Sequence, residues 1–171
     1  MRKHKYPYRI RKIFVRLNPK RLFRAYRDHY PQTLRELFES STERYAKRTL
    51  SQYVEGGDRY SYSHFRDVCD RESVRLSRFG ISAGDKVAIL SQNMPNWTVA
   101  FFTATAFGRV AIPILPDSSE NEVTNILTHS ETKVIYVSQR LLPKLSQAII
   151  DKLNRFDKVD VTLAPPHIIV K

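Results

Sequence analysis

From about residue 87 onward, short apolar runs alternate with segments whose apolar residues recur every three or four positions. The apolar runs predict strands at 87–90, 110–115 and 134–137, with further strands at 159–163 and 168–170. The recurring patterns predict helices over 95–108, 120–129 and 141–153. Alternation of this kind, with short links and strands that are apolar throughout, predicts an α/β fold with a doubly wound, mostly parallel sheet.

The segment before this alternation has a mixed pattern. A capping-box spacing, Thr33 to Glu36, predicts a helix that places Leu34, Leu37 and Phe38 on one face. Two strands at 50–55 and 60–62 around the turn 56–58 predict a hairpin, and a helix over 63–79 follows. Residues 31–171 are therefore expected to form one partial α/β domain.

Residues 1–30 are expected to form a separate basic, helical arm. Its first helix would place four apolar residues at i, i+3, i+4 and i+7, namely Ile10, Ile13, Phe14 and Leu17, with arginines and a lysine around them. Asn18 and Pro19 have the spacing of a cap and a first helical residue, which predicts a second amphipathic helix up to about residue 30.

Charge is concentrated in this arm. The chain of 171 residues has a net charge of +12, and residues 1–30 hold eleven of its 29 Lys and Arg residues but only one of its 17 acids. Any electrostatic attraction to a membrane or to nucleic acid therefore concerns the arm. The longest uncharged stretch, 87–108, is interrupted by polar residues and a proline, so we expect no transmembrane helix there. A secretory signal is not expected either.

Few residues offer catalytic chemistry. The five glycines form no phosphate-binding motif, no nucleophile elbow is present, and the five histidines show no zinc spacing. The single cysteine, Cys69, lies on the apolar stripe of its helix and is expected to be a buried small residue. Acids such as Glu120 and Glu122 are expected to complement a helix N-terminus. Four aromatic residues on and after helix 95–108 could line an apolar ligand or, more commonly, pack the helix on the sheet; they are Trp97, Phe101, Phe102 and Phe107.

The order of several segments carries more information than any one of them. These segments are TLRELF at 33–38, YSYSHF at 60–65, GDKVAILSQN at 84–93, PNW at 95–97 and FGRVAIPILPD at 107–117. In this order they resemble the N-terminal portion of the AMP-forming adenylate ligases, the acyl-CoA synthetase and luciferase superfamily, and most of all its long- or medium-chain fatty acyl-CoA synthetases. The resemblance covers about residues 32–140. His64 and Arg109 depart from it, because family members usually carry an acidic and a small residue there.

The resemblance implies a fatty acid–CoA ligase that uses ATP and Mg²⁺ to make an acyl-adenylate and then transfers the acyl group to CoA. Members are at least three times as long as this chain, and the phosphate loop and the catalytic lysine of the family would follow Lys171. We therefore expect an N-terminal fragment that is inactive alone and binds none of these cofactors. No catalytic, cofactor-binding or metal-binding residue is assigned to it.

Two other functions remain open at this stage. The arm could make the chain a nucleic-acid-binding module, although its apolar face favours an anionic membrane surface over phosphates. The chain could also be a non-catalytic interaction module built on a ligase layer. The expected partners are a fatty acid for the whole enzyme and an anionic membrane for residues 1–30, and no nucleic acid. The expected location is the cytoplasm, with peripheral attachment to the inner face of the membrane as the option that the arm opens. Acyl chain length, the acyl acceptor and the oligomeric state stay undetermined.

Overall fold

The computed structural model describes residues 31–52, 59–154 and 167–170. The chain divides into two units, Met1–Gln32 and Thr33–Lys171, and every element below belongs to the second. The two predicted arm helices, the turn at 56–58 and the predicted strand at 159–163 lie outside the described residues.

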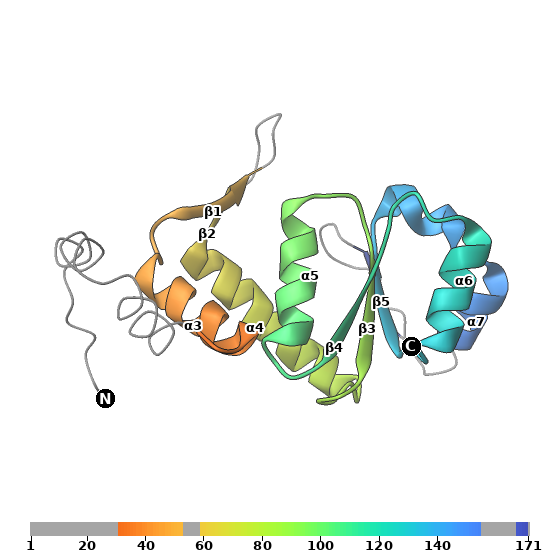
Figure 1. Ribbon diagram of the computed structural model, residues 1–171, viewed down its shortest axis with the longest axis horizontal. Helices are drawn as coiled ribbons and strands as arrows, with labels where there is room; N and C mark the ends of the chain where they lie inside the picture. Colours follow the sequence, from red (N-terminus) through yellow and green to blue (C-terminus); the bar gives the residue numbers. More distant parts are fainter. Residues whose placement is uncertain (1–30, 53–58, 155–166, 171) are drawn as a thin grey trace, which may run out of the picture. The chain divides into compact units, whose positions relative to one another are not determined.

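The larger sheet has four strands, β3 (Lys86–Leu90), β4 (Val110–Ile114), β5 (Val134–Val137) and β6 (His167–Val170), in the order β4-β3-β5-β6 (Figure 1). β3 pairs in parallel with both β4 and β5, whereas β6 is antiparallel to β5. The prediction of a mostly parallel sheet is confirmed.

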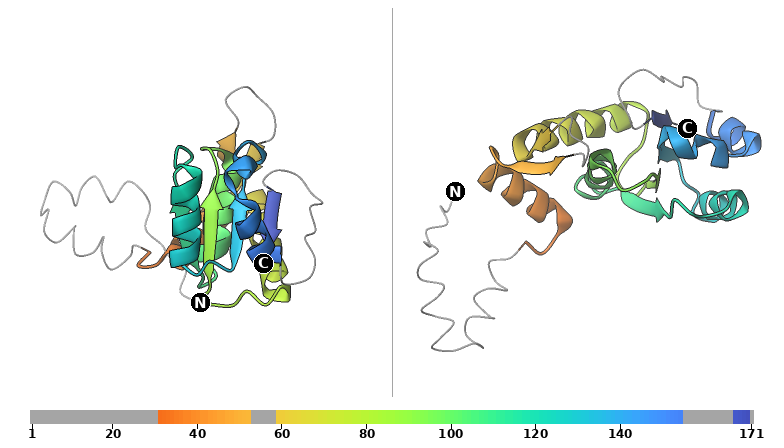
Figure 2. Two further views of the ribbon diagram at one scale, coloured as in Figure 1. Left: turned by 90° about the vertical axis from the view of Figure 1, so that its right-hand side faces the viewer. Right: turned by 90° about the horizontal axis from the view of Figure 1, so that it is seen from above.

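Helices cover both faces of this sheet. Successive strand residues point to opposite faces, so Val87 and Ile89 pack toward α5 (Pro95–Thr105), while Ala88 and Leu90 pack toward α6 (Glu120–His129). α7 (Gln147–Asn154) lies beside α6 on the second face, which Figures 1 and 2 show. Two buried layers, one on each face, confirm the doubly wound arrangement.

The N-terminal part of this unit combines α3 (Leu34–Arg44), the antiparallel pair β1 (Thr49–Gln52) and β2 (Arg59–Ser61), and α4 (Tyr62–Arg78). The predicted pairing of two hairpin strands is thus confirmed for the described residues, whereas residues 53–55 of the first predicted strand lie outside them and Tyr62 of the second belongs to α4. Phe38 of α3 contacts three aromatic rings with centroid distances of 5.6–5.9 Å, those of Phe65, Phe102 and Phe107. This aromatic cluster packs α3 against α4 and α5.

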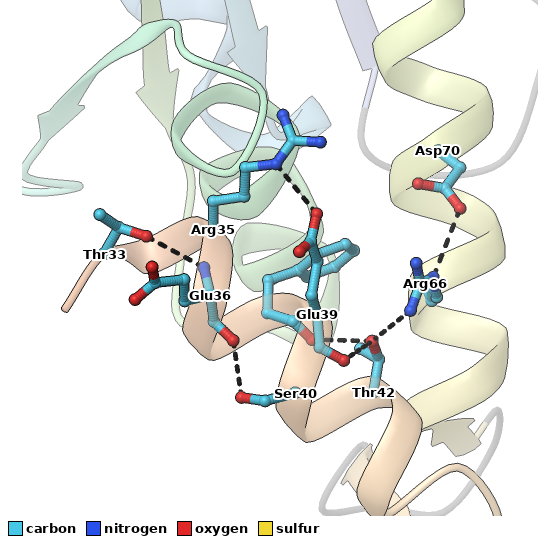
Figure 3. Close-up of polar contacts among 9 residues, drawn as sticks. Thr33, Arg35, Glu36, Glu39, Ser40, Thr42, Arg66 and Asp70 are labelled. Atoms are coloured by element: carbon cyan, nitrogen blue, oxygen red, sulfur yellow. Dashed lines mark hydrogen bonds and ion pairs between the residues drawn. The ribbon is translucent and has the colours of Figure 1, made fainter. Parts of the chain in front are cut away.

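A polar contact also joins α3 to α4 (Figure 3). Thr42 is buried, and its hydroxyl donates to the Phe38 carbonyl one turn earlier at 2.7 Å. The same hydroxyl accepts from Nη1 of Arg66 on α4 at 3.3 Å, and Arg66 also lies 3.8 Å from Asp70. The buried hydroxyl of Thr42 therefore makes its hydrogen bonds within the protein and needs no contact with solvent.

β4 is an edge strand whose free side is blunted by proline. The Val110 N–H donates to the Asp85 carbonyl. The backbone polar groups of residues 110, 112 and 114 therefore point toward β3, and those of residues 111 and 113 point toward the free side of the strand. Pro113, which has no N–H, occupies one of the outward positions. This placement keeps the β3–β4 ladder intact and removes a donor from the free edge.

Some predicted boundaries were wrong. The predicted helix 141–153 is a 3₁₀ helix, η1 (Gln139–Lys144), followed by α7. Pro143 lies inside η1 and lacks the N–H that an α-helix needs, and Leu145 is extended. On α3 only Phe38 of the predicted apolar face is buried, whereas Leu34 and Leu37 are exposed. The helix that begins at Pro95 ends at Thr105, short of the predicted residue 108. No helix in the described ranges is long and apolar enough to cross a membrane.

Candidate functional site

The carboxyl ends of β3, β4 and β5 meet at one edge of the sheet. The chain leaves β3 toward α5 on one face and leaves β5 toward η1 and α7 on the other, so the loops diverge between these two neighbouring strands. The Ser138 N–H donates to the Leu90 carbonyl at 3.0 Å, which keeps the two strands together up to this edge. Open α/β sheets bind ligands at such a point, which makes this edge the candidate site.

Neutral polar side chains line the two diverging loops. Ser91 is buried and its hydroxyl donates to the Gln92 carbonyl, while buried Asn96 accepts from the Tyr60 hydroxyl at 2.8 Å. Oε1 of Gln92 and Oγ of Ser138 are buried and have no hydrogen-bond partner among the described residues. This part of the edge can hold a neutral polar group by hydrogen bonds, and it offers no charge for catalysis.

The charged side chains at this edge stabilise the loop after β4. Nζ of Lys144 donates to the carbonyls of Pro116 at 2.6 Å and Ser118 at 2.8 Å. Ser119 caps α6, and the carboxylate of Glu122 accepts from the Ser119 N–H at 2.7 Å. The hydrogen bonds that Ser119 donates to the Glu122 carboxylate lower the pKa of Glu122, and the bond from the backbone N–H has the largest effect. The predicted capping box is confirmed, and its acids complement the helix N-terminus.

The described glycines lie at the opposite edge. Gly80, Gly84 and Gly108 have φ of 76°, 83° and 81°, and all precede the amino ends of β3 or β4. The Gly84 N–H donates to the Gly108 carbonyl at 2.8 Å, which joins the two turns. A phosphate cradle needs several free N–H groups where the strands end. The glycine turns of the described residues therefore shape the amino edge and do not form such a cradle at the candidate site.

The other residues singled out in the sequence have structural environments. Cys69 is fully buried, and burial raises the pKa of its thiol to about 12, so it is not a poised nucleophile. Among the described residues, no group of three or more His, Cys, Asp or Glu side chains could hold a metal ion. The four aromatic residues of the predicted wall divide between two layers: Phe102 and Phe107 join the cluster around Phe38, and Trp97 stacks on Phe101 over the sheet.

Arg109 is a buried cation that the sequence reasoning did not place. Its guanidinium donates to the Ser73 hydroxyl at 3.0 Å and carbonyl at 3.1 Å, to the Ser77 hydroxyl at 2.9 Å and to the Ile81 carbonyl at 3.0 Å. Burial lowers the pKa of this group. The carbonyls belong to the end of α4 and the turn after it, where a cation complements the helix dipole. The signals in the sequence were its position directly before an apolar strand and its departure from the small residue that the resemblance implies there.

His64, the other departure from the resemblance, lies at the start of α4. Its N–H donates to the hydroxyl of the capping residue Ser61 at 3.1 Å, and its ring lies 5.1 Å from that of Tyr60. An acidic residue at this position would complement the helix N-terminus. This departure therefore lies at the capped start of α4.

Comparison with known proteins decides the family. The sequence pattern of the AMP-binding enzymes matches residues 38–167, which is most of the described unit. The chain belongs to the AMP-binding enzyme family. This family member is 34% identical over 87 residues to 4-hydroxybutyrate–CoA ligase 2 of Metallosphaera sedula, covering 51% of the chain and 16% of that protein. It is 34% identical over 88 residues to long-chain-fatty-acid–CoA ligase FadD13 of Mycobacterium tuberculosis, covering 50% and 18%.

Solved structures agree with this assignment. A Mycobacterium tuberculosis fatty acyl CoA synthetase superposes with a TM-score of 0.60 at 25% identity, covering 72% of this chain and 24% of that chain. The anthranilate CoA ligase AuaEII, in complex with anthranoyl-AMP, superposes with a TM-score of 0.63 at 19% identity, covering 69% and 23%. The fold is that of the adenylate-forming ligases. The chain spans only 16% and 18% of the length of these two curated ligases.

Proposed function

We propose that the chain is the N-terminal part of a fatty acyl-CoA synthetase, an enzyme that activates a fatty acid through an acyl-adenylate and then forms a thioester with CoA. The family match over residues 38–167 is the main support, because it includes the whole parallel sheet. A fatty acid as the substrate is supported by the likeness to a ligase named for long-chain fatty acids and to a solved fatty acyl CoA synthetase.

ATP, Mg²⁺ and CoA are the cofactors that this proposal gives to the whole enzyme. The described residues of this chain do not fit the phosphates. The glycine turns lie at the amino edge, the polar side chains after β3 and β5 are neutral, and the Lys144 ammonium donates to the carbonyls of Pro116 and Ser118. We therefore assign no catalytic, cofactor-binding or metal-binding residue to the chain and derive no step through these groups. The proposed role of the chain is to support the rest of the ligase.

We also propose that the 171-residue chain does not form acyl-adenylates alone. Holding two substrates together can contribute about 7–11 kcal/mol toward a barrier, and this contribution requires that both are bound. The coding sequence beyond codon 171 tests the proposal. In one of the three frames we expect a run rich in Ser, Thr and Gly that ends near Pro-Lys-Gly within a few tens of codons. Absence of such a run from all frames would favour a non-catalytic module.

A second proposal concerns the arm, residues 1–30, which we propose binds an anionic membrane surface from the cytoplasmic side. Its support is the sequence pattern, in which Ile10, Ile13, Phe14 and Leu17 share one helical face and basic residues surround them. Each Lys or Arg near an anionic leaflet contributes about 1 kcal/mol before screening. A fatty-acid-activating enzyme would gain from this location, because its substrate partitions into bilayers.

Cosedimentation with vesicles that contain anionic lipid tests this proposal. The Ile13→Asp/Phe14→Asp variant should lose far more binding than a control with two arm arginines changed to Gln, which alters the charge equally. Equal losses would show that the apolar face is not inserted. Preference of the full chain for DNA over vesicles at physiological salt would contradict the membrane proposal and favour the nucleic-acid alternative.

A further inference from the structure

A basic and aromatic surface lies where α3 ends. The last residue of this helix is Arg44, and Tyr45 is its C-cap. The guanidinium carbons of Arg44 and Arg48 lie 5.4 Å and 5.2 Å from the centroid of the Tyr45 ring, which is within the range of a cation–π contact. The Arg48 N–H donates to the Tyr45 carbonyl at 2.7 Å, so a tight turn holds both arginines beside this ring. Both arginines are exposed.

The start of α4 completes this surface. The Tyr62 N–H donates to the Arg48 carbonyl at 3.0 Å, and the ring centroids of Tyr45 and Tyr62 lie 5.6 Å apart. Tyr62 is the first residue of α4, and the first turn of this helix carries no acid. The partial positive charge of the helix N-terminus therefore adds to the charge of the arginines. We call Arg44, Tyr45, Lys47, Arg48 and Tyr62 the basic tyrosine patch.

No carboxylate of the described ranges pairs with this patch. Residues 44–52 and 59–64 hold four Lys or Arg residues and no acid. The three cations of the patch form no ion pair with an acid in the part of the chain that the structure describes. The sequence pattern placed the concentrated basic charge in residues 1–30, so the folded unit adds a second basic surface. Neighbouring arginines suit phosphate groups, because each guanidinium presents a planar fork of donors.

Exposed leucines continue this surface along α3. Leu34 and Leu37 are each 41% exposed. Leu37 and Arg44 are about two helical turns apart, so they lie on the same side of the helix, and Leu34 borders that side one turn earlier. The glutamates of α3 lie at other positions around the turn and do not interrupt this side. One side of α3 therefore presents apolar side chains that lead to the cations of the patch.

We propose that this side of α3 and the basic tyrosine patch bind the surface of an anionic phospholipid bilayer. The arginines contact the lipid phosphates, the tyrosines lie at the headgroup level where this residue type is common, and the leucines reach the boundary of the acyl chains. Nucleic acid fits less well, because it has no use for exposed leucines and the Tyr45 ring already contacts two guanidinium groups and Tyr62. The choice of a bilayer rests in part on the proposed function, since a fatty acid partitions into bilayers, whereas the contacts are independent of residues 1–30.

Cosedimentation of the full chain with vesicles of phosphatidylcholine and phosphatidylglycerol tests the charged part of this surface. Arg44→Gln/Arg48→Gln should lower the partition coefficient by about fivefold or more at physiological salt, because cations near an anionic leaflet favour binding even when screened. The matched control, Arg71→Gln/Arg78→Gln, removes two exposed arginines of α4 outside the patch and should change binding by less than about twofold. Equal losses in the two variants would overturn the proposal.

The leucines are tested with the same vesicles. Leu34→Gln/Leu37→Gln should lower the partition coefficient by about threefold or more, since glutamine preserves the helix but does not favour the acyl-chain boundary. The matched control, Val74→Gln/Leu115→Gln, changes two exposed apolar residues elsewhere in the unit and should bind like the unmodified chain. A loss no larger than that of the control would show that α3 does not reach the boundary, which would overturn the proposal.

A dye locates the contact while all residues of the patch stay in place. Thr49→Cys introduces an exposed thiol beside Arg48, and buried Cys69 does not compete for the label. An environment-sensitive dye at this position should shift its emission when the anionic vesicles are added. The control, Thr128→Cys, carries the dye on α6, which covers the opposite face of the sheet from α5, and should not shift. Equal shifts at both positions, or no shift at position 49, would overturn the proposal.

Duplex DNA is the competing ligand in these experiments. Preference of the full chain for DNA over the vesicles at physiological salt, lost in Arg44→Gln/Arg48→Gln, would overturn the bilayer as the partner of the patch and favour nucleic acid. All of these measurements are made without ATP or fatty acid. A failure of the membrane surface is therefore distinguishable from a failure of the proposed ligase function.

Discussion

The guanidinium of Arg109 donates to both the hydroxyl and the backbone carbonyl of Ser73, which lies 36 residues earlier on α4. The two residues join the last turns of α4 to the position directly before the edge strand β4. Because the arginine is buried, its charge is stabilised by neutral oxygens and by the dipole of the helix end. This contact fixes the start of β4 relative to α4.

Arg109→Ala should destabilise the fold by about 2–4 kcal/mol, because it leaves buried carbonyls without donors and opens a void. Arg109→Lys should recover only part of the loss, since an ammonium cannot reproduce the planar fork. Urea unfolding measures both. Arg78 is an exposed arginine on α4, so Arg78→Ala is the matched control and should change stability by less than about 0.5 kcal/mol. An Arg109→Ala variant as stable as this control would show that the contact contributes nothing.

Asp85 should give the amino edge a stability that depends on pH. Its carboxylate accepts from Lys133 at 2.6 Å and from the Ser82 N–H at 2.7 Å, and these contacts, Lys133 first, lower its pKa. The stabilisation is present above the ordinary aspartate pKa and is lost as the pH falls through the lowered value. Asp85→Asn should therefore cost about 1 kcal/mol at pH 7, and this cost should shrink as the pH falls below the ordinary aspartate pKa, measured by thermal unfolding. A cost that does not vary with pH would contradict this explanation, and Asp117→Asn, at an exposed loop, is the control.

Cys69 should react with thiol reagents only when the protein opens. Its side chain is fully buried and its pKa is raised to about 12, so both access and thiolate are lacking in the folded state. Labelling at pH 8 should be at least about 100-fold slower than in denaturant. A native labelling rate equal to that of the unfolded chain would place the thiol at the surface.

The hydrogen bond from Tyr60 to Asn96 should stabilise the junction of β2 and the start of α5. Tyr60→Phe removes the donor and leaves buried Oδ1 of Asn96 without it, for an expected loss of about 1–2 kcal/mol. Tyr62→Phe, two residues away, is the control and should cost less. Equal stabilities of the two variants in urea would mean that water replaces the lost donor.

Local signals predicted the elements well and long-range contacts poorly. α6 runs from Glu120 to His129 as expected, because its capping box lies within four residues of sequence. The next helix was predicted wrongly, because the apolar pattern continues through Pro143, a residue that breaks an α-helix. Arg109 and Ser73 meet only after the sheet has formed, so no sequence window contains both. The sequence pattern predicted the parallel sheet at whose carboxyl edge the candidate site lies. It could not show that Oε1 of Gln92 and Oγ of Ser138 are buried, because their burial depends on how the loops after β3 and β5 pack.

Fatty-acid-dependent exchange of pyrophosphate into ATP tests the proposed function most directly. It should be measured with the purified 171-residue chain and with a longer product that continues through the downstream coding sequence. We expect exchange only in the longer product, because the described part of this chain holds no cradle for the phosphates at its carboxyl edge. Exchange by the 171-residue chain that survives repurification would contradict the proposal, as would a folded longer product without fatty-acid-dependent exchange.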